Sequence, residues 1–72
     1  MEDARRRLAQ YELYVGDFYR QRGKWPGAAH RYERVLAEYS GLGLDEDALF
    51  GLHEVYGQLG ETEKANAALE RI

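Results

Sequence analysis

Apolar side chains recur along this chain at intervals of three and four residues, which places them on one face of a helix. In residues 3–22 this spacing predicts a helix whose core stripe comprises Leu8, Tyr11, Val15, Phe18 and Tyr19. It also predicts a second helix that begins at Pro26, a third over residues 45–59 and a fourth over residues 62–72. The fourth helix is predicted to turn inward Ala65, Ala68, Leu69 and Ile72.

Residues that favour helix ends stand between these segments. Gly23, Gly41 and Gly60 are predicted to end the first three helices, because glycine readily adopts the left-handed conformation that closes a helix. Asp45 and Thr62 are predicted to be the N-caps of the third and fourth helices, since a side-chain oxygen can accept a bond from the first free N–H groups. The chain therefore divides into four helices separated by short turns.

The chain also repeats itself with an offset of 37 residues. With Gly23 aligned on Gly60, the matching pairs are Val15 and Leu52, Tyr19 and Tyr56, Ala28 and Ala65, Tyr32 and Leu69, and Val35 and Ile72. Each unit is a helix, a glycine turn and a second helix, which is the layout of a tetratricopeptide (TPR) unit. The usual period is about 34 residues, so the extra residues are expected in the linker over residues 40–45. The predicted fold is all-α: two tandem TPR-like hairpins of four antiparallel helices, a fragment of an α-solenoid.

The domain prediction is a single TPR-type domain over residues 1–72. Repeat one spans about residues 8–42, and repeat two spans about residues 45–72 and is truncated. Repeats of this kind usually need about three or more units for stability, so both open ends are expected to be covered by neighbouring repeats in a longer protein. In isolation, a homo-oligomer is the alternative.

The composition of the chain argues against a catalytic or metal-binding site. The chain has no cysteine, one serine and one threonine, so neither a thiolate site nor a catalytic triad is expected. His30 and His53 lie 23 residues apart on different predicted helices, which favours surface or packing roles over a metal pair. The acidic run at residues 45–47 lacks the glycine and distal glutamate of a calcium loop. We expect no enzyme activity, cofactor, metal or small-molecule substrate.

Charge is unevenly distributed. Residues 1–36 hold eight Lys and Arg against five Asp and Glu, which gives +3, and residues 37–72 hold two against eight, which gives −6. These sum to the net charge of −3. The run Arg5-Arg6-Arg7 is expected to be solvated or to contact a preceding repeat, and the overall acidity argues against nucleic acid as a partner. No stretch approaches the roughly 18 apolar residues of a membrane span, and any targeting signal is expected elsewhere.

A protein-binding surface is predicted on the first and third helices, which line the concave groove of TPR arrays. Most aromatic residues fall on the packed stripes, but Tyr14 and Phe50 lie off them, where aromatic side chains suit an interface. The candidate groove residues are Tyr14, Asp17, Arg20, Gln21, Phe50, Glu54 and Gln58. The alternative is that neighbouring repeats cover this surface.

One stretch gives a more specific signal than the general repeat pattern. It is the run YELYVGDFYRQRGKW over residues 11–25, followed by Ala28, Ala29, Arg31, Glu33, Leu36 and Tyr39. Together these residues resemble the C-terminal repeats of the BamD family, also called YfiO or ComL, over nearly the whole chain. The resemblance implies a part in outer-membrane β-barrel protein assembly at the periplasmic face of the bacterial outer membrane. It also implies partners among the subunits of that machinery and a membrane attachment only through a lipidated cysteine outside this chain.

Two other interpretations stay open on the sequence alone. The chain could be a generic cytoplasmic TPR adaptor, or a purely structural repeat segment with no binding site of its own. Binding of a free C-terminal carboxylate is not expected, since Leu13 and Asp17 stand where carboxylate-clamping TPR domains have lysine and asparagine.

Overall fold

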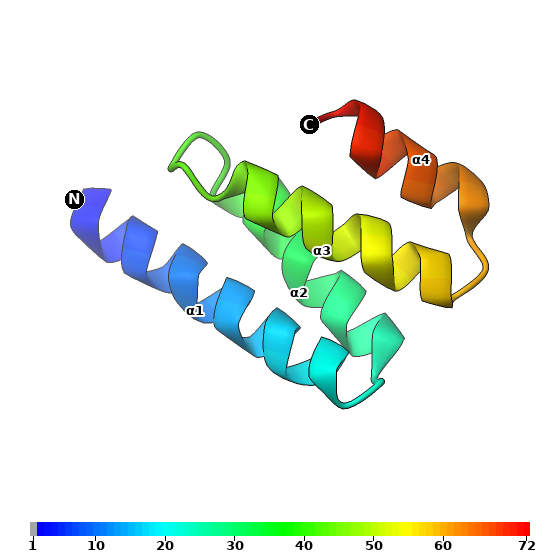
Figure 1. The fold of residues 1–72 in the computed structure, drawn as a ribbon. Coiled ribbons are helices and arrows are strands. Elements are labelled where there is room, and N and C mark those ends of the chain that lie inside the picture. The colour runs from blue at the N-terminus through cyan, green and yellow to red at the C-terminus, as the bar shows by residue number, and fades with distance from the viewer. Residues whose placement is uncertain (1) are drawn as a thin grey trace.

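The computed structural model describes residues 2–72, and every regular element in that range is a helix. The helices are α1 Glu2–Gln21, α2 Trp25–Glu38, α3 Asp45–Gln58 and α4 Thr62–Glu70. Each helix packs against the next in the chain, and α1 also meets α3 (Figure 1). The Cα atoms fill a slab of 38 × 26 × 13 Å, so few side chains have helices on all sides. The all-α prediction of two tandem helical hairpins is confirmed; the repeat boundaries at residues 8–42 and 45–72 stay predictions.

The turns after α1 and α3 have the same geometry. Gly23 and Gly60 have φ of +72° and +76°. In each turn the glycine N–H donates to the carbonyl three residues back, at 3.0 and 3.2 Å, and the next N–H donates to the carbonyl five residues back, at 2.9 Å. This pair of bonds is the Schellman motif, in which a left-handed glycine satisfies the last helical carbonyls. The 37-residue offset found in the sequence therefore relates two equivalent bends.

The predicted N-caps of α3 and α4 are wrong by one residue. Leu44 and Glu61 hold these positions, and neither makes a side-chain cap hydrogen bond. Asp45 is already helical, and its Oδ1 instead accepts a bond from the Gly41 N–H at 3.2 Å, which ties the helix start to the preceding loop. Thr62 is likewise the first residue of its helix. The second helix also begins one residue before Pro26.

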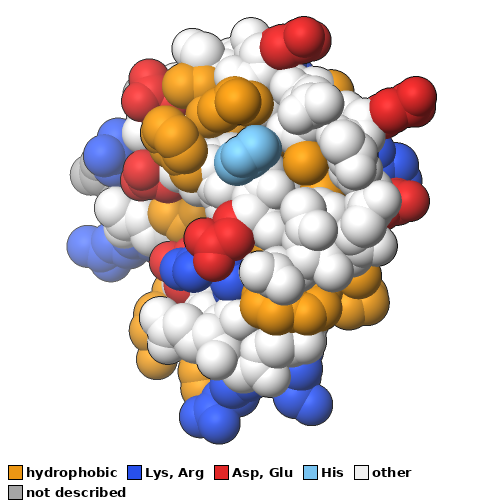
Figure 2. Space-filling view, turned by 45° about the vertical axis from the view of Figure 1, so that its right-hand side comes forward, with side chains coloured by type: hydrophobic (Ala, Val, Ile, Leu, Met, Phe, Trp, Pro, Cys, Tyr) orange, Lys and Arg blue, Asp and Glu red, His pale blue; other side chains and the backbone are white. Residues whose placement is uncertain are grey.

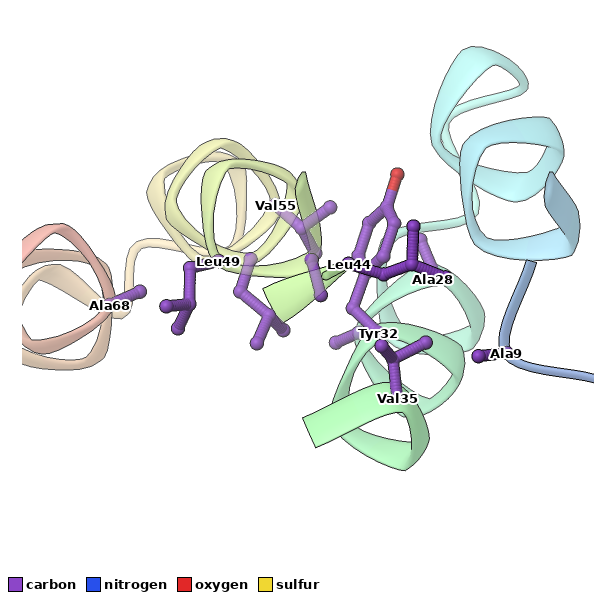
Figure 3. Packing of buried hydrophobic residues seen from close by; sticks show 11 residues of the cluster. Ala9, Ala28, Tyr32, Val35, Leu44, Leu49, Val55 and Ala68 are labelled. Atoms are coloured by element: carbon purple, nitrogen blue, oxygen red, sulfur yellow. The ribbon is translucent and has the colours of Figure 1, made fainter. Parts of the chain in front are cut away.

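The core consists mainly of small side chains around one large ring. The described hydrophobic residues with no exposed surface are Ala9, Ala28, Tyr32, Val35, Ala48 and Val55. Figure 3 shows the Tyr32 ring rising from α2 between α1 and α3, with its hydroxyl at the far end. Small residues let the helices approach closely, and the close approach encloses the ring.

The predicted stripe of α1 is wrong in three positions. Leu8, Tyr11 and Phe18 are exposed, at 53%, 59% and 41%. The side of α1 that faces α2 instead buries Ala9 and Glu12, together with a glycine at position 16. The spacing predicts a core of large residues, whereas this helix pair packs through its small residues. In α4, Ala65 and Ala68 are buried as predicted, but Leu69 and Ile72 are exposed because no helix among residues 2–72 covers them.

Candidate functional site

Tyr32 connects the two repeats through the backbones of α1 and α3. A β-carbon on Gly16 would lie 2.8 Å from its Cε1, and one on Gly51 would lie 2.5 Å from its Cζ. Both distances are far inside van der Waals contact, so only glycine fits on either side of this ring. The aromatic ring of α2 is thus held between two glycines, one on each neighbouring helix.

The Tyr32 hydroxyl emerges in a cluster of charged groups. It donates a hydrogen bond to Oδ1 of Asp17 and accepts one from Nε of Arg20 at 3.1 Å. Nη1 of Arg20 reaches across to Oε2 of Glu54 at 3.3 Å, and Nη2 lies 3.7 Å from Oδ1 of Asp17. One guanidinium therefore bridges α1, α2 and α3.

Burial and hydrogen bonding raise two pKa values in this cluster, those of Tyr32 and Arg20. Burial, followed by the hydrogen bond to Asp17, raises the pKa of Tyr32 to about 12. The hydrogen bond with Tyr32 is the main cause that raises the pKa of Arg20. At neutral pH the phenol is therefore a neutral donor and the guanidinium is charged, and both are held in fixed directions.

A cavity of about 240 Å³ opens above this cluster between α1 and α3. Its lining residues are Leu13, Asp17, Arg20, Asp47, Phe50, Gly51 and Glu54. Three carboxylates and one guanidinium give the cavity a formal charge of −2, and the Phe50 ring beside them is 52% exposed. Figure 2 shows a face of the molecule on which acidic and basic side chains lie side by side between hydrophobic patches. Such a surface suits recognition of a mixed polar and apolar segment.

The structure gathers four of the seven candidate groove residues. Asp17, Arg20, Phe50 and Glu54 line the cavity. The other three are exposed and do not belong to its lining: Tyr14, Gln21 and Gln58. Tyr14, one turn before Asp17 on α1, is 67% exposed. The central residue Tyr32 was not among the candidates, because its hydroxyl reaches the site by passing between two glycines that are distant in sequence.

A cluster of ion pairs around the buried Glu12 was not predicted. Glu12 is only 6% exposed. Its Oε1 lies 2.8 Å from Nη1 of Arg31, and its Oε2 lies 3.4 Å from Nε of Arg34. The hydrogen bond to Glu12 is the main cause that raises the pKa of Arg31. A glutamate between Ala9 and Gly16 on the packed side of α1 is the sequence signal that points to such a pair.

The amino-terminal arginines bind backbone of this same chain. Arg5 donates to the Glu38 carbonyl and Arg6 to the Leu42 carbonyl, both at 2.7 Å. Two of the three arginines thus hold the end of α2 and the following loop, where free carbonyls favour positive charge. All three arginines are exposed, as expected of a solvated run, and a contact to a preceding repeat stays a prediction.

The histidines do not form a site together. His30 is exposed, whereas Nδ1 of His53 lies 2.8 Å from the Ala65 carbonyl and so connects α3 to α4. Within residues 2–72 no three His, Cys, Asp or Glu side chains are grouped as metal ligands. No helix in the described part of the chain has the length and hydrophobicity to cross a membrane.

The comparisons with known proteins agree with one another. The family described as "YfiO: Outer membrane lipoprotein" matches residues 1–71. The outer membrane protein assembly factor BamD of Haemophilus influenzae is 34% identical over 59 residues, which are 82% of this chain and 22% of that protein. BamD of Xylella fastidiosa is 35% identical over 68 residues, 94% of this chain and 23% of that protein. The chain thus spans less than a quarter of these relatives, and no solved structure matches it significantly.

Proposed function

The chain belongs to the YfiO family of outer membrane lipoproteins, and from this premise we propose that it is a non-enzymatic, protein-binding scaffold segment of an outer membrane protein assembly factor. The two relatives are named outer membrane protein assembly factors, and this chain matches less than a quarter of the length of each. The binding surface we assign to it is the cavity between α1 and α3, with Asp17, Arg20, Phe50 and Glu54 as its contact residues.

The observation that carries this proposal is the fixed position of Arg20 beside an exposed aromatic ring. Its guanidinium is held by Tyr32 and Glu54, so little side-chain entropy is lost when a partner binds there. Phe50 offers an apolar surface at the same cavity, and aromatic residues next to arginine are typical anchors of protein interfaces. The net negative lining favours a partner segment that carries a basic or amide side chain beside an apolar one.

We base the proposed cellular location and partners on the family. The parent protein would lie at the periplasmic face of the outer membrane, attached through a lipid outside this chain. The partners would be the periplasmic domains of the barrel-forming subunit and other lipoproteins of the assembly machinery. We place the contact at the cavity between α1 and α3 because its lining joins charge, fixed geometry and exposed apolar surface.

Binding of the chain to the periplasmic domains of the barrel-forming subunit tests this function. Phe50→Ala should weaken binding about 5- to 30-fold, the effect of losing an interface anchor worth roughly 1–2 kcal/mol. The control is Leu59→Ala, which removes another exposed apolar side chain near the end of the same helix, outside the cavity. Equal affinities for the two variants would contradict the proposal.

A purely structural role is the second candidate, because Arg20 already has partners on all three helices around it. In that case Phe50→Ala would leave partner binding unchanged, and the substitution Arg20→Ala would lower stability only. A cytoplasmic TPR adaptor would instead bind other partners and fail to bind the periplasmic domains.

A further inference from the structure

The three carboxylates that line the cavity between α1 and α3 are not equivalent. Two of them share Arg20, whose Nη2 lies 3.7 Å from Oδ1 of Asp17 and whose Nη1 lies 3.3 Å from Oε2 of Glu54. Asp17 also accepts the hydrogen bond from the Tyr32 hydroxyl. The third carboxylate, that of Asp47, forms no ion pair or side-chain hydrogen bond within residues 2–72. Its charge therefore has no counter-charge in the described chain.

Asp47 lies beside the exposed ring of Phe50. The two residues are one turn apart on α3, and both line the cavity. Side chains three positions apart on a helix lie on the same side, so a carboxylate and a ring that is 52% exposed adjoin each other in the cavity wall. Asp45 and Glu46, the other acidic residues of this first turn, do not line the cavity. Only one acid of this turn therefore belongs to it.

A carboxylate beside an aromatic ring suits a guanidinium group. The planar guanidinium can donate hydrogen bonds to a carboxylate and at the same time lie over the face of a ring. The chain makes one half of this contact itself on α1, where the Arg22 guanidinium lies 4.1 Å from the centre of the Phe18 ring. In the part of the chain that the structure describes, no cation lies over the Phe50 ring. The ring of Phe50 is thus available to a cation from another molecule.

The remaining lining accommodates the stem of such a side chain. Leu13 contributes apolar surface from α1, and Gly51 contributes no side chain, which leaves room between the two helices. An arginine side chain buries its methylene groups along apolar surface while its charged end stays with polar groups. The formal charge of −2 over the lining favours a cation over an acidic or neutral side chain.

We infer that the partner docks an arginine side chain in this cavity, with its guanidinium bound to the carboxylate of Asp47 and lying over the ring of Phe50. The inference rests on the proposed function and narrows it, since it specifies arginine among basic and amide side chains and adds Asp47 to the contact residues. Arg20 has a different role in this contact. Because Arg20 partly neutralises the other two carboxylates and repels a second cation, the incoming guanidinium is directed to Asp47.

The affinity for the periplasmic domains of the barrel-forming subunit tests the inference. Asp47→Asn should weaken binding about 3- to 10-fold, and this difference from wild type should shrink in high salt because the contact is ionic. Glu46→Gln is the matched control, since it removes the neighbouring carboxylate of the same helical turn and loses a similar interaction with the helix dipole. The control should bind like wild type, and the two variants should unfold at similar temperatures.

The results distinguish this inference from the proposed function. If Phe50→Ala weakens binding while Asp47→Asn and Glu46→Gln bind equally well, the binding surface stands and the arginine contact is overturned. If none of the three variants changes the affinity, the proposed function itself is contradicted, and the inference that rests on it falls as well.

A titration without the partner tests the cavity alone. In NMR spectra of the wild-type chain, Nα-acetyl-arginine amide at up to about 100 mM should shift the backbone amide signals of Asp47 and Phe50. The uncharged citrulline analogue should leave these signals in place, and Asp47→Asn should abolish the shifts that Glu46→Gln retains. Equal shifts with both compounds, or no shift with either, would overturn the inference even if Phe50→Ala weakens partner binding.

Discussion

The ring of Tyr32 rests directly on the backbone of Gly51, so closely that a β-carbon there would lie 2.5 Å from Cζ. This contact joins the first repeat to the second, because Tyr32 belongs to α2 and Gly51 to α3. The same ring carries the hydroxyl that positions Asp17 and Arg20 at the cavity. Packing between repeats and the geometry of the candidate site thus depend on one side chain.

Gly51→Ala should destabilise the chain by about 1–3 kcal/mol, the range for overpacking a closed core. Gly57→Ala is the matched control on the same helix, since a β-carbon there meets no atom within 4 Å. It should stabilise the helix by about 0.4–1 kcal/mol. Urea denaturation of both variants measures the difference, and equal effects would mean that Tyr32 does not fill this space.

Stability should fall at high pH through Tyr32. Its pKa is raised by burial to about 12 in the folded chain, against about 10 when unfolded. The unfolded chain releases this proton first, so the contribution is complete below pH 10 and is lost as pH rises toward 12, at about 1.4 kcal/mol per pH unit. Denaturation of wild type and Tyr32→Phe between pH 8 and pH 12 checks this. The variant should show a shallower loss, and parallel curves would refute the assignment.

Removing the charge of Glu12 should be costly. Glu12→Gln leaves two arginines of α2 without a carboxylate at a buried position, and the expected loss is about 1–3 kcal/mol. Lys64→Gln removes one partner of an exposed ion pair with Glu61 and should change stability by less than about 0.5 kcal/mol. The midpoints of thermal unfolding rank the two variants. A neutral result for Glu12→Gln would show that the buried pair adds nothing.

The two equivalent turns should respond alike to substitution. Gly23→Ala and Gly60→Ala each force a β-carbon into a left-handed conformation, at φ of +72° and +76°. Each should lose about 1–2 kcal/mol of stability. Losses that differ by much more than this range would mean that the bends are not energetically equivalent, even though their hydrogen bonds are.

The repeat and the turns could be predicted because they depend on local rules. Gly23 and Gly60 adopt the left-handed conformation that closes a helix, and the 37-residue offset therefore located both bends. The core side of α1 could not be predicted in the same way. Large residues such as Tyr11 and Phe18 had the right spacing, but the burial of Glu12 depends on two arginines that α2 brings to it. The spacing of residues within α1 gives no information about those arginines.

The candidate site could likewise be predicted only in part. Arg20 and Glu54 were placed in one groove because the first and third helices of such repeats lie side by side. The role of Tyr32 was missed, since its hydroxyl reaches the groove only through the gap left by Gly16 and Gly51. Tyr14 was grouped with Phe50 because both lie off the packed stripes, yet only Phe50 lines the cavity.

Site-specific photo-crosslinking in the native cells tests the central claim most directly, with the crosslinking residue placed at Phe50 or, as control, at Leu59. Both side chains are exposed, and only Phe50 lines the cavity between α1 and α3. The proposed function predicts a crosslink from position 50 to the barrel-forming subunit of the outer-membrane assembly machinery and none from position 59. Absence of that crosslink at position 50, or equal yields at the two positions, would contradict it.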